Sequence, residues 1–122
     1  MKRKFENMIK GLKRILYAFG YSYDGFKAIF KSEPAFRQDL VIFIVFSPIA
    51  LMLDLTALEK ALMVFSLFFI LFAECVNTAF EVTINRISTD IHPLSKEVKD
   101  IGSLIVLLSF VNAIVVWAVI LL

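Results

Sequence analysis

Two acidic side chains and one amide interrupt a stretch of sequence that is otherwise apolar enough to lie in a lipid bilayer. Glu74, Asn77 and Glu81 fall within the run of residues 61–84, at spacings of three and four residues. On a helix these spacings place all three on one face, within an arc of about 60 degrees. A carboxylate at bilayer depth costs about 2.5 to 3.5 kcal/mol, so this face must meet protein, water or a metal ion rather than lipid. We therefore interpret this face as a candidate functional site.

A second set of polar residues follows this run, in a segment from Arg86 to Asp100 that we predict to be a loop. It holds groups suited to phosphate and metal ions, namely Asp90, His92, Ser95, Lys96, Lys99 and Asp100. Two carboxylates from different helices, such as Glu33 and Glu81, can hold a magnesium ion and leave its other coordination positions to nucleotide phosphates and water. The pattern indicates phosphoryl transfer, although the chain contains neither the P-loop motif nor GxGxxG.

Simpler structural roles account for some of these residues. Asn77 and Thr78 are suited to hydrogen bonds between membrane helices, which contribute about 0.6 kcal/mol each. The lysines of the loop fit a solvated surface, and one His with a distant Cys does not supply a zinc site. A purely structural role does not explain Glu74 and Glu81, because a glutamine would make similar hydrogen bonds at a lower cost in the membrane.

The elements that must position these residues are membrane-spanning helices. The chain has 122 residues, of which 60% are hydrophobic, and its mean hydropathy of +0.83 lies outside the usual range of soluble domains. Three stretches can span a bilayer, at residues 34–55, 61–84 and 101–122. The first has a short apolar core, so a chain with two spans is the alternative. We predict an all-α integral membrane protein, with a surface-helix region at residues 1–31 and three spans in a single domain at residues 32–122.

The distribution of charge predicts how the chain crosses the membrane. Nine of the thirteen Lys and Arg residues precede the apolar core of the first span at residues 40–53, three lie between the second and third spans, and only Lys60 lies between the first and second. The positive-inside rule then places the N-terminus and the 86–100 loop in the cytoplasm. The first 30 residues lack the features of a signal peptide, so we expect the chain to be mature as written. A net charge of +2 favours anionic lipid headgroups over nucleic acid as a partner.

Apolar residues recur at helical spacing before the first span, from Phe5 to Phe19, with basic residues on the other faces. This pattern predicts an amphipathic helix on the cytoplasmic membrane surface that ends at Gly20. A second short surface segment follows at residues 21–31, before Pro34 begins the next helix.

Three segments together resemble the prokaryotic membrane diacylglycerol kinases. They are Glu33 to Asp39 (EPAFRQD), Ala73 to Glu81 (AECVNTAFE) and Lys99 to Ser103 (KDIGS). The resemblance extends from about Ile9 to Trp117, with these segments in the family's order and spacing. It implies a homotrimer in the bacterial inner membrane, with active sites between subunits, that uses magnesium and ATP to phosphorylate the hydroxyl of diacylglycerol at the cytoplasmic interface.

The resemblance also assigns roles by position. Glu74 matches the family's general base, Glu33 and Glu81 its metal-binding carboxylates, and Asn77, Lys99 and Asp100 its other polar catalytic residues. The implied ATP-binding residues are Arg14, Tyr21, Glu33, Glu81, Asp90, Ile91, His92, Lys99 and Asp100. The implied lipid-side residues are Arg14, Ala18, Phe19, Gly20, Tyr21, Ser22, Tyr23, Lys27, Ala28, Ile29, Phe30, Ala35, Phe36, Arg37, Gln38, Asp39, Glu74 and Ser103.

Two residues depart from the family pattern. Asn85 stands where members carry Asp, and Met52 where they carry Trp, so no charge or anchoring role is assigned there.

Three other functions remain as alternatives. The nearest is an undecaprenol kinase of the same superfamily. A small transporter or proton-relay subunit would use intramembrane carboxylates as well, but would leave Lys99, Asp100 and His92 unexplained. A scaffold whose polar face only fixes subunit packing is the third.

Overall fold

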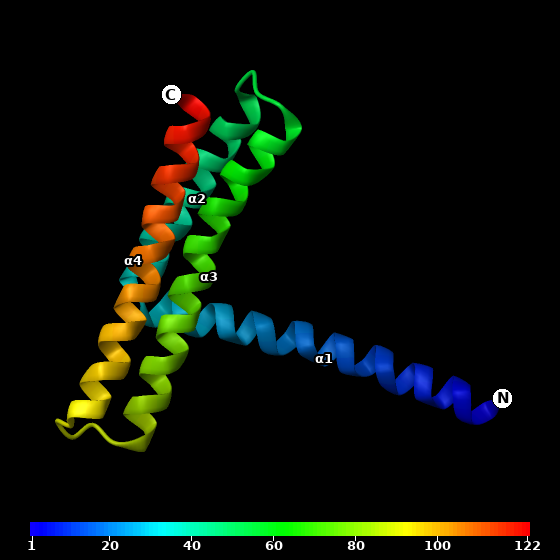
Figure 1. The fold of residues 1–122 in the computed structure, drawn as a ribbon. Helices are drawn as coiled ribbons and strands as arrows, with labels where there is room; N and C mark the ends of the chain where they lie inside the picture. Colours follow the sequence, from blue (N-terminus) through cyan, green and yellow to red (C-terminus); the bar gives the residue numbers. More distant parts are fainter. The chain divides into compact units, whose positions relative to one another are not determined.

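The structure, a computed structural model, describes all of residues 1–122. It contains four α-helices and no strands: α1 (Lys2–Ser32), α2 (Pro34–Met52), α3 (Ala57–Ile87) and α4 (Pro93–Leu121) (Figure 1). The chain divides into two compact units, one formed by Met1–Ser32 and the other by Glu33–Leu122.

The first unit is the single helix α1, which continues through Gly20. The prediction that a helix ends at this glycine is wrong, because α1 runs on to Ser32. A glycine inside a helix costs only about 1 kcal/mol relative to alanine, and the Ser22 hydroxyl donates to Ala18 O at 2.9 Å across this turn. The helix stops only before Pro34, whose ring disfavours helical backbone in the residue that precedes it.

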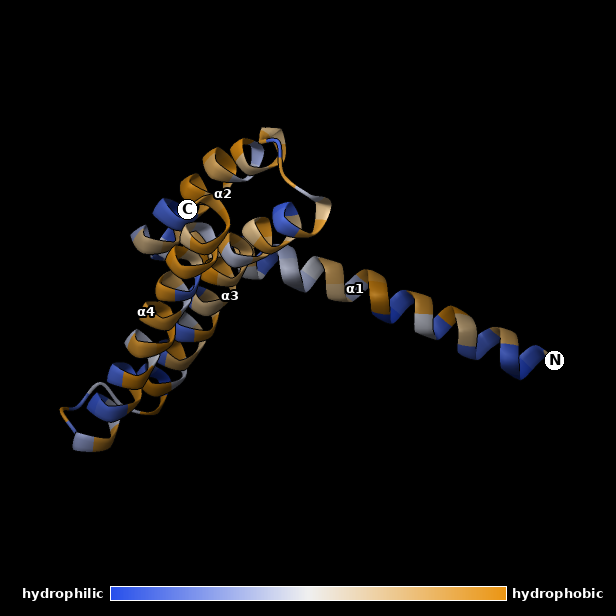
Figure 2. Ribbon diagram, turned by 45° about the horizontal axis from the view of Figure 1, so that its top comes forward, coloured by the Kyte–Doolittle hydropathy of each residue, from blue (hydrophilic) through white to orange (hydrophobic).

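The second unit contains three helices that are long and apolar enough to cross a membrane. The prediction of an all-α protein with three spans is therefore confirmed, and hydrophobic residues dominate α2, α3 and α4 in Figure 2. At 1.5 Å per residue, α2 is about 28 Å long, whereas α3 and α4 are each more than about 40 Å long. A bilayer core is about 30 Å thick. One end of the α3–α4 pair therefore extends beyond the hydrocarbon.

The loop between α3 and α4 is much shorter than predicted. Helix α3 continues to Ile87 and α4 begins at Pro93, so only residues 88–92 are not helical. His92 occupies the N-cap position of α4, and its ring accepts a hydrogen bond from the Leu94 N–H at 3.1 Å. Pro93 follows at the first helical position, where its missing N–H costs nothing. Lys99 and Asp100 thus lie on a helix rather than in a loop.

Helix α3 packs against both α2 and α4. Leu67 and Ile70 of α3 form the core with Ala113 of α4, and partly buried apolar residues of α2 and α4 pack around them. On the side away from the α3–α4 loop, the Trp117 indole N–H donates to Met63 O at 3.3 Å and to Ser66 Oγ at 3.2 Å. These bonds fix the register of α3 and α4, so that Asn77 and Gly102 lie opposite each other nearer the α3–α4 loop.

A tight turn joins α2 to α3. Thr56 and Glu59 form a capping box, in which each side chain binds the other residue's backbone N–H. The Lys60 ammonium donates to Leu51 O at 3.0 Å, near the end of α2. These contacts satisfy helix-end groups and hold α2 and α3 antiparallel.

Candidate active site

Four polar side chains are buried together on the inner faces of α2 and α3. Glu74 is 5% exposed, Asn77 9% and Thr78 7% on α3, and Asp39 on α2 is 6% exposed. Three atoms of this cluster, Asp39 Oδ2, Asn77 Oδ1 and Thr78 Oγ1, have no hydrogen-bond partner. Because buried polar groups are normally paired, these atoms mark a place where a further group can bind. We call Asp39, Glu74, Asn77 and Thr78 the buried polar cluster.

The acidic residues around Glu74 come from two helices. Asp39, Glu33 and Glu81 all lie close enough to interact electrostatically with the Glu74 carboxylate. Glu33 occupies the N-cap position of α2, but its side chain makes no capping hydrogen bond, and Glu81 is half-buried on α3. Like charges repel one another, and this repulsion is stronger in a low dielectric than in water. The site therefore favours a bound cation.

The donor set fits magnesium better than a metal caged by protein. Nowhere along residues 1–122 do three or more Asp, Glu, His or Cys side chains come together as a possible metal site. Magnesium, however, is commonly bound by one or two carboxylates, with water and substrate phosphates completing its shell. Glu33 and Glu81 offer oxygens of that kind at the border of the cluster. This arrangement is compatible with the magnesium site that the sequence predicts.

A glycine lets α4 approach the buried polar cluster. A Cβ added to Gly102 would overlap Asn77 Oδ1 and lie 3.2 Å from Asn77 Cγ. Lys99 is one turn from Gly102, and Glu81 is one turn from Asn77, both toward the α3–α4 loop. In an antiparallel helix pair these two side chains therefore begin at the same level. The role of Gly102 was not predicted from the sequence, although small residues often mark close contacts between membrane helices.

Five of the predicted nucleotide-binding residues line one cleft beside the α3–α4 loop. This cleft has a volume of about 320 Å³, and its walls include Asp90, Ile91, His92, Lys99 and Asp100. The N-terminal turn of α4 lies here, and helix N-termini favour phosphate groups. The structure thus brings together residues that are separated by as many as ten positions in the chain.

Two residues of this cleft also have structural partners. His92 caps α4 through its Nδ1 atom, which leaves Nε2 as the nitrogen that carries hydrogen in the neutral ring. Asp100 pairs with Lys96 at 2.5 Å, and both side chains are largely exposed. Lys99, by contrast, is an exposed cation in the wall of the cleft. Of the cleft's basic residues, Lys99 is the better placed to meet phosphate.

The predicted lipid-side residues at the start of α2 divide between two faces. Phe36 and Asp39 are buried, whereas Ala35 and Gln38 are exposed and Arg37 is intermediate. Ser103 of α4, next to Gly102, is exposed as well.

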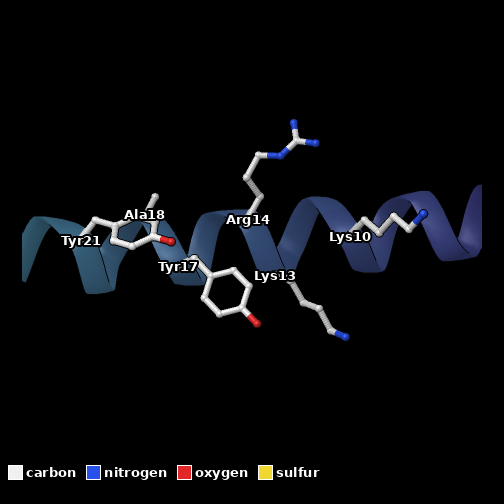
Figure 3. A pocket seen from close by; sticks show the side chains of 6 residues that line it. All are labelled: Lys10, Lys13, Arg14, Tyr17, Ala18 and Tyr21. Atoms are coloured by element: carbon white, nitrogen blue, oxygen red, sulfur yellow. The ribbon is translucent and has the colours of Figure 1, made fainter.

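The remaining predicted residues lie on α1, in the other unit. Arg14, Ala18 and Tyr21 share one face of α1 with Lys10, Lys13 and Tyr17. Within this face, the side chains of Arg14 and Lys13 extend to opposite sides rather than converging (Figure 3). Further along the helix, the Lys27 ammonium lies 5.2 Å from the centre of the Tyr23 ring. The other predicted residues of this helix are Phe19, Gly20, Ser22, Ala28, Ile29 and Phe30, all within α1.

The fold and the buried polar cluster together define a small integral membrane protein with an acidic site inside its helical bundle. Comparison with known proteins identifies the family within this class. Residues 20–121 match the family of the prokaryotic diacylglycerol kinases. The chain is 46% identical over 112 residues to a diacylglycerol kinase of Pseudomonas aeruginosa, covering 92% of this chain and 91% of the relative. It is 36% identical over 115 residues to the diacylglycerol kinase of Escherichia coli K12, covering 94% of each chain. The chain therefore belongs to the prokaryotic diacylglycerol kinase family, whose members are membrane-bound lipid kinases.

Proposed function

We propose that this protein transfers the γ-phosphate of ATP to the hydroxyl of diacylglycerol, giving phosphatidate. The burial of Glu74 among other acidic residues carries this proposal within a family of diacylglycerol kinases. Glu74 lies about 26 Å along α3 from Ala57, close to the edge of a bilayer core about 30 Å thick. A lipid hydroxyl at the membrane interface would meet the carboxylate at this depth.

The residues divide the chemistry between them. Glu74 accepts the proton of the lipid hydroxyl as its oxygen attacks the γ-phosphorus, and Asn77 orients the carboxylate. Lys99 stabilises negative charge on the transferred phosphoryl group, and the cleft around His92 and Asp90 holds the nucleotide. Glu33 and Glu81 would hold magnesium, which when bound neutralises charge on the ATP phosphates.

We further propose that the active form is a homotrimer in the bacterial inner membrane, with the N-terminus and the α3–α4 loop in the cytoplasm. The positive-inside rule supports this orientation, since only one of thirteen basic residues lies in the α2–α3 turn region. Many large apolar side chains of α2, α3 and α4 are exposed, and lipid or other subunits would cover them.

Magnesium-dependent transfer of labelled γ-phosphate by the purified protein in detergent tests the proposal, with diacylglycerol and undecaprenol offered in parallel. We expect labelled phosphatidate. Glu74→Gln should reduce its formation by about 10²- to 10⁴-fold, the usual contribution of a general base. Glu97→Gln is the matched control, because it makes the same change at an exposed position of α4 outside the predicted site.

Each other outcome has a definite meaning. Labelled undecaprenyl phosphate alone would keep the mechanism and replace the substrate. No label in either lipid, from protein shown to be folded, would refute the kinase proposal and favour a proton relay through Glu74. Normal turnover by Glu74→Gln would refute the assignment of the base.

A further inference from the structure

One amide on α4 has no partner within its own chain, although it lies deep in a membrane span. Asn112 is exposed and makes no side-chain hydrogen bond. It precedes the end of α4 at Leu121 by nine residues, or about 14 Å, so it lies near the middle of a bilayer core about 30 Å thick. Hydrocarbon offers no water to an amide, and leaving its groups unpaired there is costly. Asn112 therefore needs a partner from outside its own chain.

A backbone carbonyl on α2 lacks its usual partner at a similar depth. Proline has no N–H, so Pro48, inside α2, cannot form the helical hydrogen bond to the Ile44 carbonyl. The nearby Ser47 hydroxyl does not replace it, since Ser47 Oγ has no hydrogen-bond partner. Ile44 precedes the end of α2 at Met52 by eight residues, or about 12 Å. Because Ile44 is 60% exposed and Pro48 is exposed as well, this carbonyl is an acceptor on the outer side of α2, near the depth of Asn112.

Within one chain the amide and the carbonyl point away from each other. Helices α2 and α4 both pack on α3, and the end of α4 lies at the same end of the bundle as the α2–α3 turn (Figure 1). The side chains that line the apolar space shared by α2 and α4 include Ile42, Phe46, Phe110 and Ile114. Ile44 lies midway between the first two and Asn112 midway between the last two, and side chains two positions apart on a helix do not face the same way. The Asn112 amide can therefore reach only the Ile44 carbonyl of another copy.

We propose that Asn112 of one copy donates a hydrogen bond to the Ile44 carbonyl of a second copy, so that the outer side of α4 packs on the outer side of α2. This inference rests on the homotrimer proposed above and names a contact between its subunits. The two surfaces differ, so the contact is heterologous, and contacts of this kind can close into rings. Each of three copies then supplies one amide and one carbonyl, and every such group is paired.

The surroundings of Asn112 favour this partner over two others. Lipid tails cannot hydrogen-bond to the amide, and its exposed neighbours Leu108, Val111 and Val115 are all apolar. A symmetric contact between two copies of α4 would pair Asn112 with its counterpart, but would leave the Ile44 carbonyl without a partner. Only the contact between α4 and α2 satisfies both groups.

Cysteine cross-linking of the full-length protein in membranes tests whether the two positions meet. The variants are made in a Cys75→Ala background, because Cys75 is the only cysteine of the chain. Ile44→Cys combined with Asn112→Cys should give linked dimers and trimers on mild oxidation, since a disulfide requires Cα atoms within about 7 Å. Neither single-cysteine variant should give linked species. Ile44→Cys with Ile114→Cys is the matched control and should give none, because Ile114 is exposed at nearly the same depth but on another side of α4.

Two results of the cross-linking would overturn the inference. Linked dimers from Asn112→Cys alone would show that two copies of α4 face each other. No linked species from the double variant, at unchanged helix content, would show that the two positions do not meet. Linked trimers from a protein that phosphorylates no diacylglycerol would refute the proposed kinase function but not the contact, and phosphorylation without linked species would do the reverse.

A second test removes the donor and the acceptor separately, without added cysteines. Energy transfer between copies labelled at the N-terminus measures the dissociation of the trimer as neutral detergent is added. Asn112→Leu removes the amide, and because a hydrogen bond between membrane helices changes an equilibrium constant roughly threefold, three such contacts should make dissociation roughly 20-fold more favourable. Pro48→Ala supplies the N–H that pairs the Ile44 carbonyl within α2, so in that background Asn112→Leu should have an effect of less than about threefold. Equal effects of Asn112→Leu in the two backgrounds would overturn the inference.

Discussion

The contact between Gly102 and Asn77 yields a prediction whose magnitude follows from the structure. Gly102→Ala places a Cβ where it overlaps Asn77 Oδ1, so the Asn77 side chain must rotate or α4 must move away from α3. Overpacking of this kind costs about 1 to 3 kcal/mol. Alanine also favours the helix over glycine by up to about 1 kcal/mol. The net loss in the free energy of unfolding should therefore be about 0 to 2 kcal/mol.

A double-mutant cycle separates these two effects. In an Asn77→Ala background the overlap disappears, so Gly102→Ala should then stabilise the protein by up to about 1 kcal/mol. The coupling between the two substitutions should be about 1 to 3 kcal/mol. Gly11→Ala is the matched control, since a Cβ at Gly11 meets nothing within 4 Å and only the preference of the helix for alanine applies.

The free energies come from unfolding at fixed protein concentration, with sodium dodecyl sulfate titrated into neutral detergent micelles and helix content followed by circular dichroism. If the effects of Gly102→Ala and Asn77→Ala simply add, the proposed contact between α3 and α4 is wrong. The position assigned to Asn77 in the active site would then be wrong as well.

Three further predictions concern the contacts that hold the helices. Trp117→Phe keeps an aromatic ring but loses the hydrogen bonds to Met63 and Ser66, so the free energy of unfolding in detergent should fall by about 1 kcal/mol, and no loss would show that these bonds contribute nothing. Thr56→Ala removes the capping box of α3 and should cost about 1 kcal/mol in the same assay, whereas Thr56→Ser should cost less than half of that. His92→Asn keeps an N-cap acceptor for α4, so stability should stay near that of the unchanged protein while KM for ATP rises; an unchanged KM would limit His92 to its capping role.

The sequence was sufficient to predict the number of membrane helices but not their ends. A bilayer requires about 20 apolar residues per span, and that requirement is visible as hydropathy alone. The ends of the helices depend on local capping and backbone interactions, which do not appear in the hydropathy of the sequence. The His92 cap with Pro93 after it begins α4 eight residues before the predicted start at residue 101, and α1 tolerates Gly20 because one glycine costs little within a long helix.

The candidate site was predictable only as far as it lies on one helix. Spacings of three and four residues placed Glu74, Asn77 and Glu81 on a common face, and the structure buries the first two. The residues that other helices contribute to the site depend on how the helices pack, and the spacing of residues along one helix does not show this. The burial of Asp39 beside this face and the approach of Gly102 to Asn77 both follow from the register between helices.

The two halves of the helical bundle differ in how many of their buried polar atoms have hydrogen-bond partners. In its far half, Ser66 Oγ donates to Met63 O at 2.7 Å and Ser109 Oγ to Val106 O at 2.6 Å, so these two buried hydroxyls bond within their own helices. In the half nearer the α3–α4 loop, Asp39, Asn77 and Thr78 each keep a buried atom without a partner. Ser47, in the far half of the bundle on α2, is the one exception there. Because an unpaired buried polar atom costs about 1 to 3 kcal/mol, the chain gives up stability mainly in the half where we propose that the reacting groups bind.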